Sequence, residues 1–233
     1  MFRWLWLLLS VLPCAAQTTE VYEVIAIEYP PFTTSKTIEG GLAFHILQQA
    51  FPDDKFRPHI VPPKRAYHMI QHGQWCLSFY PSGEGVASHK IILSEQNIVI
   101  GLIRRQQAKP FKWQTLDELS GSRIAILRSG DSSPFSSRFN QAGLSITYTE
   151  SIQQSVDLVL RQRVDMAMYD DYNFARLNTA VRDQLQFSET SLLQTPVTLF
   201  TNPSCKIPLP KNHQPKPLTP ANQLAADAAP LRG

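Results

Sequence analysis

Most residue combinations that carry catalysis or bind metals are incomplete in this sequence of 233 residues. His68 and His72 have the i, i+4 spacing with which one face of a helix can hold a metal ion. Met69 stands where the HExxH motif has glutamate and no third ligand is evident, so we interpret the pair as a solvent-facing surface. Residues 82–85, "SGEG", lack the GKS or GKT ending of a phosphate loop, and no GxSxG elbow occurs. The sequence therefore predicts no catalytic residue, no metal site and no cofactor.

Cysteine chemistry is limited by number and spacing. Three cysteines occur, and Cys14 lies in the N-terminal apolar segment. Cys76 and Cys205 lack the CxxC spacing of zinc or redox sites, and neither has a convincing base partner. In an oxidising compartment these two can form a disulfide bond with each other, and two free thiols are the alternative.

The chemistry that remains is the binding of a small molecule, and the corner "YPPF" at residues 29–32 is its first candidate. The apolar pattern over 23–27 predicts a strand that stops at the two prolines. Proline fixes φ, so the corner holds Tyr29 and Phe32 without an entropy loss on binding. Ligands of open α/β sheets lie beyond the carboxyl ends of the strands, which makes both rings candidates for ligand contact. The alternative is that both rings only fill the core.

Polar groups occur at two further strand ends. The loop "SGDSS", residues 129–133, precedes a predicted helix, whose free N–H groups would suit a carboxylate or another anion. Asp170 ends the predicted strand 164–169. It is either a buried acid at a binding site, or it caps the next helix, as its neighbour Asp171 also could.

The N-terminus has the pattern of an export signal. Arg3 precedes an apolar run over residues 4–12, which is shorter than the ~18 to 20 residues of a membrane span. We therefore predict a signal peptide over 1–16 and a mature chain from near Gln17, located in the periplasm. Lipid attachment at Cys14 is the alternative, although a proline precedes it where a lipobox has a small residue.

The rest of the chain alternates between strands and helices in two blocks. In the first block we expect strands over 23–27, 75–80 and 97–103 and helices over 42–51 and 64–73. In the second block we expect a short helix capped by Thr115 and Glu118, strands over 123–128, 144–149, 164–169 and 196–201, and helices over 134–142, 151–163 and 171–177.

This alternation predicts an α/β fold with two lobes joined by a two-stranded hinge. The chain crosses near 102–107 and returns near 193–200. The expected parts are lobe 1 at 17–103, lobe 2 at 104–192, a return strand at 193–202 and a proline-rich tail at 203–233. Seven of the 18 prolines lie in that tail, so we expect no packed helix or sheet there.

Four segments, in this order, carry a resemblance: "YPPF", "RAYHMIQHG", "LDELSGSRIAILRSGDSS" and "LRQRVDMAMYD". Over about residues 20–200 the chain resembles the bacterial family 3 extracellular solute-binding proteins, the amino-acid-type receptors of ABC importers. The resemblance implies a type II fold whose lobes close on a small ligand. It implies ligand contacts by Tyr29, Phe32 and Tyr80, by the Ser132 hydroxyl, and by Asp170, which would bind an ammonium group.

Two departures from the family stand out. Members that bind α-amino acids carry an arginine before an "FS" pair, and here Ala87 or Ser88 stands in that place. Lys90 or His89 can lend charge, but lysine does not reproduce the guanidinium fork. Arg65 either approaches the cleft from the second helix or is solvated. The family's closing helix is replaced by the proline-rich tail.

These observations favour a monomeric periplasmic protein that captures a polar, amine-bearing solute for an ABC permease. Without residues 1–16 the chain has 21 basic and 19 acidic residues, so nothing indicates a nucleic-acid partner. One alternative is an enzyme that resembles cyclohexadienyl or arogenate dehydratases, with Glu28 or Asp170 as the acid. The other is a degenerate lobe pair that serves as a sensor or partner subunit. The identities of the solute and the permease stay open.

Overall fold

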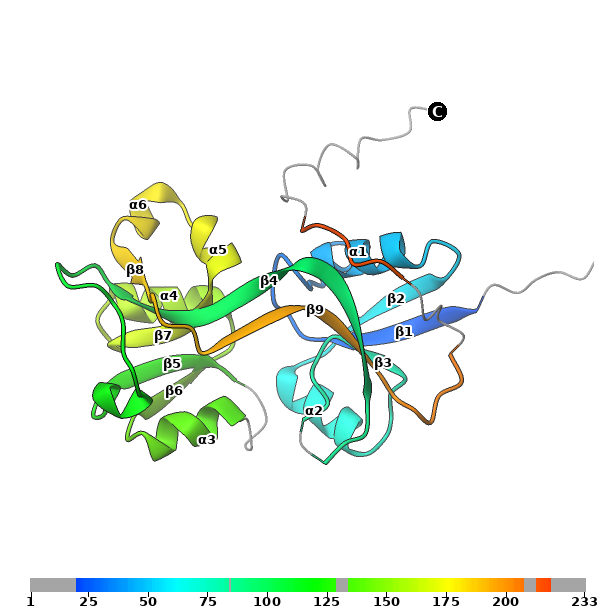
Figure 1. The fold of residues 1–233 in the computed structure, drawn as a ribbon, viewed down its shortest axis with the longest axis horizontal. Coiled ribbons are helices and arrows are strands. Elements are labelled where there is room, and N and C mark those ends of the chain that lie inside the picture. The colour runs from blue at the N-terminus through cyan, green and yellow to red at the C-terminus, as the bar shows by residue number, and fades with distance from the viewer. Residues whose placement is uncertain (1–19, 84, 129–133, 208–212, 219–233) are drawn as a thin grey trace, which may run out of the picture.

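The computed structural model of the chain describes residues 20–83, 85–128, 134–207 and 213–218. The predicted signal peptide, the loop residue Ser132 and most of the proline-rich tail lie outside these residues. The described elements form two α/β lobes connected by two long strands (Figure 1), so the predicted fold class is confirmed. No helix among the described residues is long and apolar enough to cross a membrane.

Lobe 1 is built on three parallel strands with one helix on each face (Figure 1). Its elements are β1 (Val21–Ala26), α1 (Leu42–Ala50), β2 (Lys55–Ile60), α2 (Pro63–Gln71) and β3 (Leu77–Ser78). Successive side chains of a strand point to opposite faces. Val24 and Ala26 of the central strand β1 therefore pack with α1, whereas Ile25 packs with Ala66 and Ile70 of α2. This burial on both faces explains the three consecutive apolar residues at the end of β1.

Strand β2 is absent from the sequence-based prediction. Among the described strands it pairs with β1 alone, at the edge of the sheet, and its side chains are partly or fully exposed. Pro58 lies in its middle, opposite Val24. Proline is tolerated at a sheet edge because its missing N–H would face solvent there, but a proline and few apolar residues conceal a strand from pattern analysis.

Lobe 2 repeats the arrangement. Its elements are the 3-10 helix η1 (Leu116–Leu119), β5 (Arg123–Leu127), α3 (Pro134–Gln141), β6 (Ser145–Thr149), α4 (Ile152–Leu160), β7 (Met166–Asp170), α5 (Asp171–Ala175), α6 (Thr179–Arg182) and β8 (Leu185–Phe187). Strand β5 lies between β6 and β7 and is parallel to both. Ile124 and Ile126 of β5 pack with Phe139 of α3, and Ala125 packs with Val156 of α4. The short elements α6 and β8 were not predicted, because three or four residues are too few for a recognisable period.

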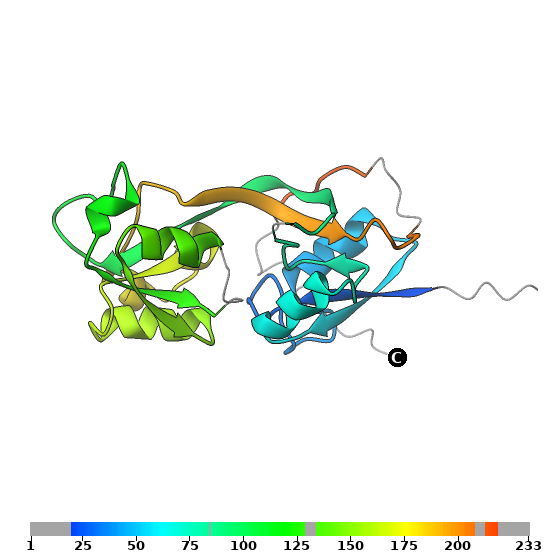
Figure 2. The same cartoon turned by 90° about the horizontal axis from the view of Figure 1, so that it is seen from below.

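Two antiparallel hinge strands connect the lobes, β4 (His89–Arg105) and β9 (Leu193–Thr201). They join the sheets of both lobes in the order β2-β1-β3-β9-β4-β7-β5-β6. Figure 2 shows both strands on the same side of the two lobes. Strand β4 is longer than predicted, since the polar residues 94–97 interrupt its apolar pattern. It pairs with β7 from Ile100 onward, a few residues before the predicted lobe boundary.

The structure contains the disulfide bond between Cys76 and Cys205, whose Cα atoms are 5.6 Å apart. Cys76 precedes β3 and Cys205 follows β9, and these two strands pair with each other. The bond spans 129 residues of sequence, a stretch that includes all of lobe 2. It therefore fastens the returning chain to lobe 1.

The tail segment 213–218 lies along β4, beside the interruption of its pairing with β9. The Lys216 N–H donates to the Leu93 carbonyl at 2.7 Å, and the Lys216 carbonyl accepts from the Glu95 N–H at 3.0 Å. Leu218 packs against the core of lobe 1. The tail thus forms one backbone bridge here, and part of it packs on lobe 1 without forming a helix or a strand.

Candidate functional site

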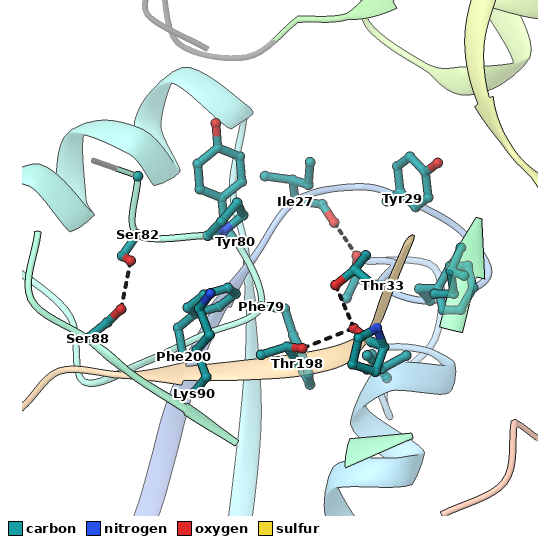
Figure 3. Close-up of a pocket in the computed structure, with 18 of the residues that line it drawn as sticks. Ile27, Tyr29, Thr33, Phe79, Tyr80, Ser82, Ser88, Lys90, Thr198 and Phe200 are labelled. Atoms are coloured by element: carbon teal, nitrogen blue, oxygen red, sulfur yellow. Dashed lines mark hydrogen bonds between the residues drawn. The ribbon is translucent and has the colours of Figure 1, made fainter. Parts of the chain in front are cut away.

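An open cavity of 860 Å³ lies between the corner after β1, the loop after β3 and the two hinge strands (Figure 3). This volume is within the range of ~300 to 1,000 Å³ that small-molecule sites occupy. Most of its lining side chains are aliphatic or aromatic: Ile27, Tyr29, Phe32, Ala43, Phe79, Tyr80, Pro81, Val86, Ala87, Ile98, Ile100, Leu193, Pro196, Val197 and Phe200.

Main-chain hydrogen bonds hold the corner in shape. Tyr29 and Thr33 exchange two of them, at 2.8 and 3.1 Å. The carbonyls of Pro31 and Phe32 accept from the first two N–H groups of α1, both at 2.8 Å, so the corner caps a helix that has no side-chain cap. Gly41 precedes this helix with φ 101°, and a Cβ there would lie 2.7 Å from the Pro31 oxygen. The rigid corner therefore ends β1 and starts α1 while it places two rings at the cavity.

Tyr29 also reaches lobe 2. Its hydroxyl donates to Asp170 Oδ2 at 2.6 Å, a contact between residues 141 positions apart. Asp170 is fully buried and caps α5, accepting from Asn173 N at 2.7 Å and from Asn173 Nδ2 at 2.9 Å. Burial raises the pKa of Asp170, although the hydrogen bonds from Tyr29 and Asn173 act in the opposite direction. Burial and the neighbouring carboxyl group raise the pKa of Tyr29 well above its usual value, so its hydroxyl stays protonated.

Two further contacts join the start of α5 to the rest of the chain. The rings of Phe32 and Tyr172 lie 4.9 Å apart between their centroids. Asp171 Oδ1 accepts from the Val99 N–H of the hinge strand β4 at 3.0 Å. Lobe 2 therefore contacts the corner of lobe 1 through Asp170, the last residue of β7, and through Tyr172 of α5.

The residues that the sequence predicts for the ligand are only partly brought together. Tyr29, Phe32 and Tyr80 all line the cavity, and Phe32 also belongs to the core of lobe 1. Arg65 is exposed on α2 and does not line the cavity. Ser132 lies outside the described residues. The aromatic part of the prediction thus coincides with a cavity, whereas neither Arg65 nor Asp170 lines it.

The sequence indicated Lys90 only as a charge near the missing arginine, and it did not predict that strand β9 and Ser82 form part of the site. Phe200 of β9 lines the cavity, and Lys90 Nζ lies 5.9 Å from the centroid of its ring. Ser82 Oγ and Ser88 Oγ share a hydrogen bond of 2.8 Å in the same wall (Figure 3). The signal available in the sequence was the missing arginine near Ser88, which directed attention to this segment but not to the cavity behind it.

Glu28, the acid considered for the dehydratase alternative, does not line the cavity. Its carboxylate accepts hydrogen bonds from Thr34 Oγ1 at 2.5 Å and from the N–H and hydroxyl of Ser35, both at 2.9 Å. Partial burial raises its pKa, but these hydrogen bonds outweigh that effect and the pKa is lowered. Glu28 is therefore an ionised residue that shapes the loop after the corner. Among the described residues no group of three or more potential metal ligands occurs.

No protein-family model and no curated protein sequence matches the chain. Solved structures do match it. The GluR0 ligand-binding core in complex with L-glutamate is 13% identical, with a TM-score of 0.62 over 81% of this chain and 87% of that one. An ancestral arginine-binding protein bound to arginine is 12% identical, with a TM-score of 0.59 over 79% and 85%. An arginine 3rd transport system periplasmic binding protein from Legionella pneumophila is 12% identical, with a TM-score of 0.56 over 78% and 86%.

At such low identity the likeness establishes the fold. The chain has the two-lobed fold of type II periplasmic binding proteins. This agrees with the family resemblance noted in the sequence.

Proposed function

We propose that this chain is a periplasmic solute-binding protein that captures a small molecule between its two lobes and presents it to an ABC-type importer. The position of the cavity carries the proposal, because both hinge strands, β4 and β9, form part of its wall. A ligand there contacts the segments that determine the angle between the lobes. The predicted signal peptide supports export, and the Legionella pneumophila arginine protein is a periplasmic transport component with the same fold.

Two cavity residues can couple ligand binding to lobe contact. The Tyr29 hydroxyl reaches Asp170 of lobe 2, and the Phe32 ring lies against Tyr172 of lobe 2. A ligand that packs against these two rings stabilises the conformation in which they touch lobe 2. Binding energy then shifts the population toward closed lobes, as in other hinge-closing proteins.

The amine-bearing solute inferred from the sequence would bind Asp170. This carboxyl group is buried and already accepts hydrogen bonds from Tyr29 and Asn173, so an ammonium would reach it by replacing the Tyr29 hydroxyl. For such a ligand, Asp170→Asn should lower the affinity roughly a hundredfold or more, because removing one partner of a buried charge pair costs ~3 to 5 kcal/mol.

A thermal-shift screen of the purified exported protein, followed by calorimetry, tests the function. We expect at least one solute among amino acids, polyamines and small organic anions to raise the melting temperature. Ala87→Phe, which places a ring in the cavity, should abolish that shift, whereas Ala108→Phe on an exposed loop of lobe 2 should not. If no solute binds, the proposal is refuted in favour of a sensor or partner subunit. Turnover of prephenate or arogenate would instead support the dehydratase alternative.

A further inference from the structure

The described lining of the cavity carries a positive charge. Among the described lining residues, Lys90 is the one charged side chain, and no acid is present. Lys90 forms no ion pair with any described residue. Its ammonium group lies over the Phe200 ring, 5.9 Å from the centroid, and Phe200 is its neighbour across the hinge strands. A cation–π contact of this kind holds the charge beside the cavity without neutralising it.

Hydroxyl groups lie in the same wall. Ser82 and Ser88 share one hydrogen bond of 2.8 Å, which uses one of their two hydroxyl protons and leaves the other for a ligand. Figure 3 shows Ser82 and Ser88 on one side of the pocket, Lys90 beside Phe200 below them, and Tyr29 on the opposite side. One end of the pocket therefore offers a cation and a hydroxyl donor, which together suit a carboxylate.

The remaining walls suit an apolar body. The Phe79 and Phe200 rings and the aliphatic side chains of Ile27, Ile98 and Val197 line the pocket. These walls also include Thr33, Thr195 and Thr198, but their hydroxyl groups already donate to main-chain carbonyls. A polar amino-acid side chain would therefore find few donors there, and burying it unpaired would cost free energy. An aromatic or branched aliphatic group would gain about 25 cal/mol for each Å² of apolar surface removed from water.

From this arrangement we infer that the ligand is a small carboxylate with an aromatic or branched aliphatic body, whose carboxylate pairs with Lys90 and whose body fills the apolar part of the cavity. The inference rests on the proposed function and specifies its ligand class. Closure of the lobes would exclude water from the pocket and so strengthen the pairing of the two charges. An amine is not required, because the acid that could bind one, Asp170, is fully buried behind Tyr29.

Three probes that share one phenyl body separate the polar groups. They are 3-phenylpropanoate, with the carboxylate only, 2-phenylethylamine, with the amine only, and L-phenylalanine, with both. Propanoate, which lacks the ring, tests the apolar body. We expect titration calorimetry of the exported protein to detect 3-phenylpropanoate, and to find 2-phenylethylamine and propanoate each at least about tenfold weaker.

Lys90→Met keeps the length of the side chain and removes its charge. It should weaken 3-phenylpropanoate about tenfold to a hundredfold, the range for a charge-assisted hydrogen bond, whereas Lys90→Arg should retain most of the affinity. Lys55→Met, on the exposed edge strand β2, is the matched control and should bind like the parent. Melting temperatures without ligand report whether each variant is folded. If Lys90→Met does not fold, the comparison of the probes on the parent protein decides whether the cavity selects a carboxylate.

The results that would refute this ligand class differ from those that would refute the proposed function. If 2-phenylethylamine binds at least as tightly as 3-phenylpropanoate, or if folded Lys90→Met binds like the parent, the inference is wrong while the proposed function stands. The same holds if none of the four probes binds but another solute in the broader screen does. If no solute binds at all, the proposed function fails together with the inference.

Discussion

The hydrogen bond between Tyr29 and Asp170 is the strongest candidate for a latch between the lobes, and Tyr29→Phe removes it with little other change. The donor and acceptor oxygens are 2.6 Å apart, and Asp170 is fully buried. The phenylalanine ring can keep the contact with Phe32, whose centroid lies 6.3 Å away. Asp170 would retain only its two bonds from Asn173 among the described donors.

The expected loss of stability follows from the type of hydrogen bond that Tyr29→Phe removes. A hydrogen bond to a charged group contributes ~1.5 to 3 kcal/mol, and its loss leaves part of a buried carboxylate unsatisfied. For a chain of this size each kcal/mol corresponds to ~2 to 4 °C, so we expect the melting temperature at pH 7 to fall by roughly 3 to 12 °C. Because this bond lowers the Asp170 pKa, its removal should also raise that pKa further above its usual value.

Thermal denaturation followed by circular dichroism measures the loss, and small-angle X-ray scattering reports the separation of the lobes. The variant should have a larger radius of gyration than the parent protein. Tyr22→Phe is the matched control, since the one hydrogen bond of the Tyr22 hydroxyl to a described residue is an exposed contact of 3.4 Å with Glu20. If Tyr29→Phe has the melting temperature and the scattering profile of the parent, the contact does not hold the lobes together and the reasoning is refuted.

Three further predictions concern stability. Reduction of the disulfide bond between Cys76 and Cys205 should lower the free energy of unfolding by roughly 3 to 5 kcal/mol. Urea denaturation with and without reductant measures this loss, and two titratable thiols in the oxidised, denatured protein would contradict the pairing. Truncation after residue 212 should lower the free energy of unfolding by about 2 to 4 kcal/mol, because it removes the backbone hydrogen bonds of Lys216 and the packing of Leu218. An unchanged midpoint of urea denaturation would show that the tail does not stabilise lobe 1. Burial raises the pKa of Asp170 in the folded protein above its usual 3.8, so the folded state favours the protonated carboxyl group. The stability that this proton contributes is fully present below pH 3.8 and is lost as the pH rises through the folded-state pKa. Asp170→Asn should lack this loss, and parallel stability profiles of parent and variant between about pH 4 and 7 would refute the assignment.

Much of the fold follows from local patterns. The helices α1, α2 and α4 are visible as apolar periods because each buries one face, and β5 is visible as an unbroken apolar run because both of its faces are buried. In each case the signal lies within ten or so neighbouring residues. The corner after β1 is visible for a similar reason, since two prolines next to aromatic residues restrict the backbone wherever they occur. The alternation of these elements was sufficient to predict two α/β lobes and a hinge.

Elements whose stability comes from their neighbours were hidden. Strand β2 has a proline and few buried side chains, and it exists because β1 offers its hydrogen-bonding edge. Strand β4 continues through polar residues because β9 pairs with it on both sides of the interruption. The tail segment 213–218 is held by contacts with β4 and with Phe51, the residue that follows α1, rather than by any propensity of its own.

The candidate site also combines residues that the local sequence identifies with contacts that only the fold creates. Residue types and local order identified Tyr29, Phe32 and Asp170 as candidates, because strand ends and helix starts have local signatures. Only the tertiary structure decided that the Tyr29 hydroxyl lies on Asp170, 141 positions away, and that Lys90 and Phe200 meet across the hinge. Such contacts depend on how two lobes pack and on which residues stand opposite each other in an antiparallel pair. No periodicity within either segment records that register, so the chemistry of the cavity was decided by the fold.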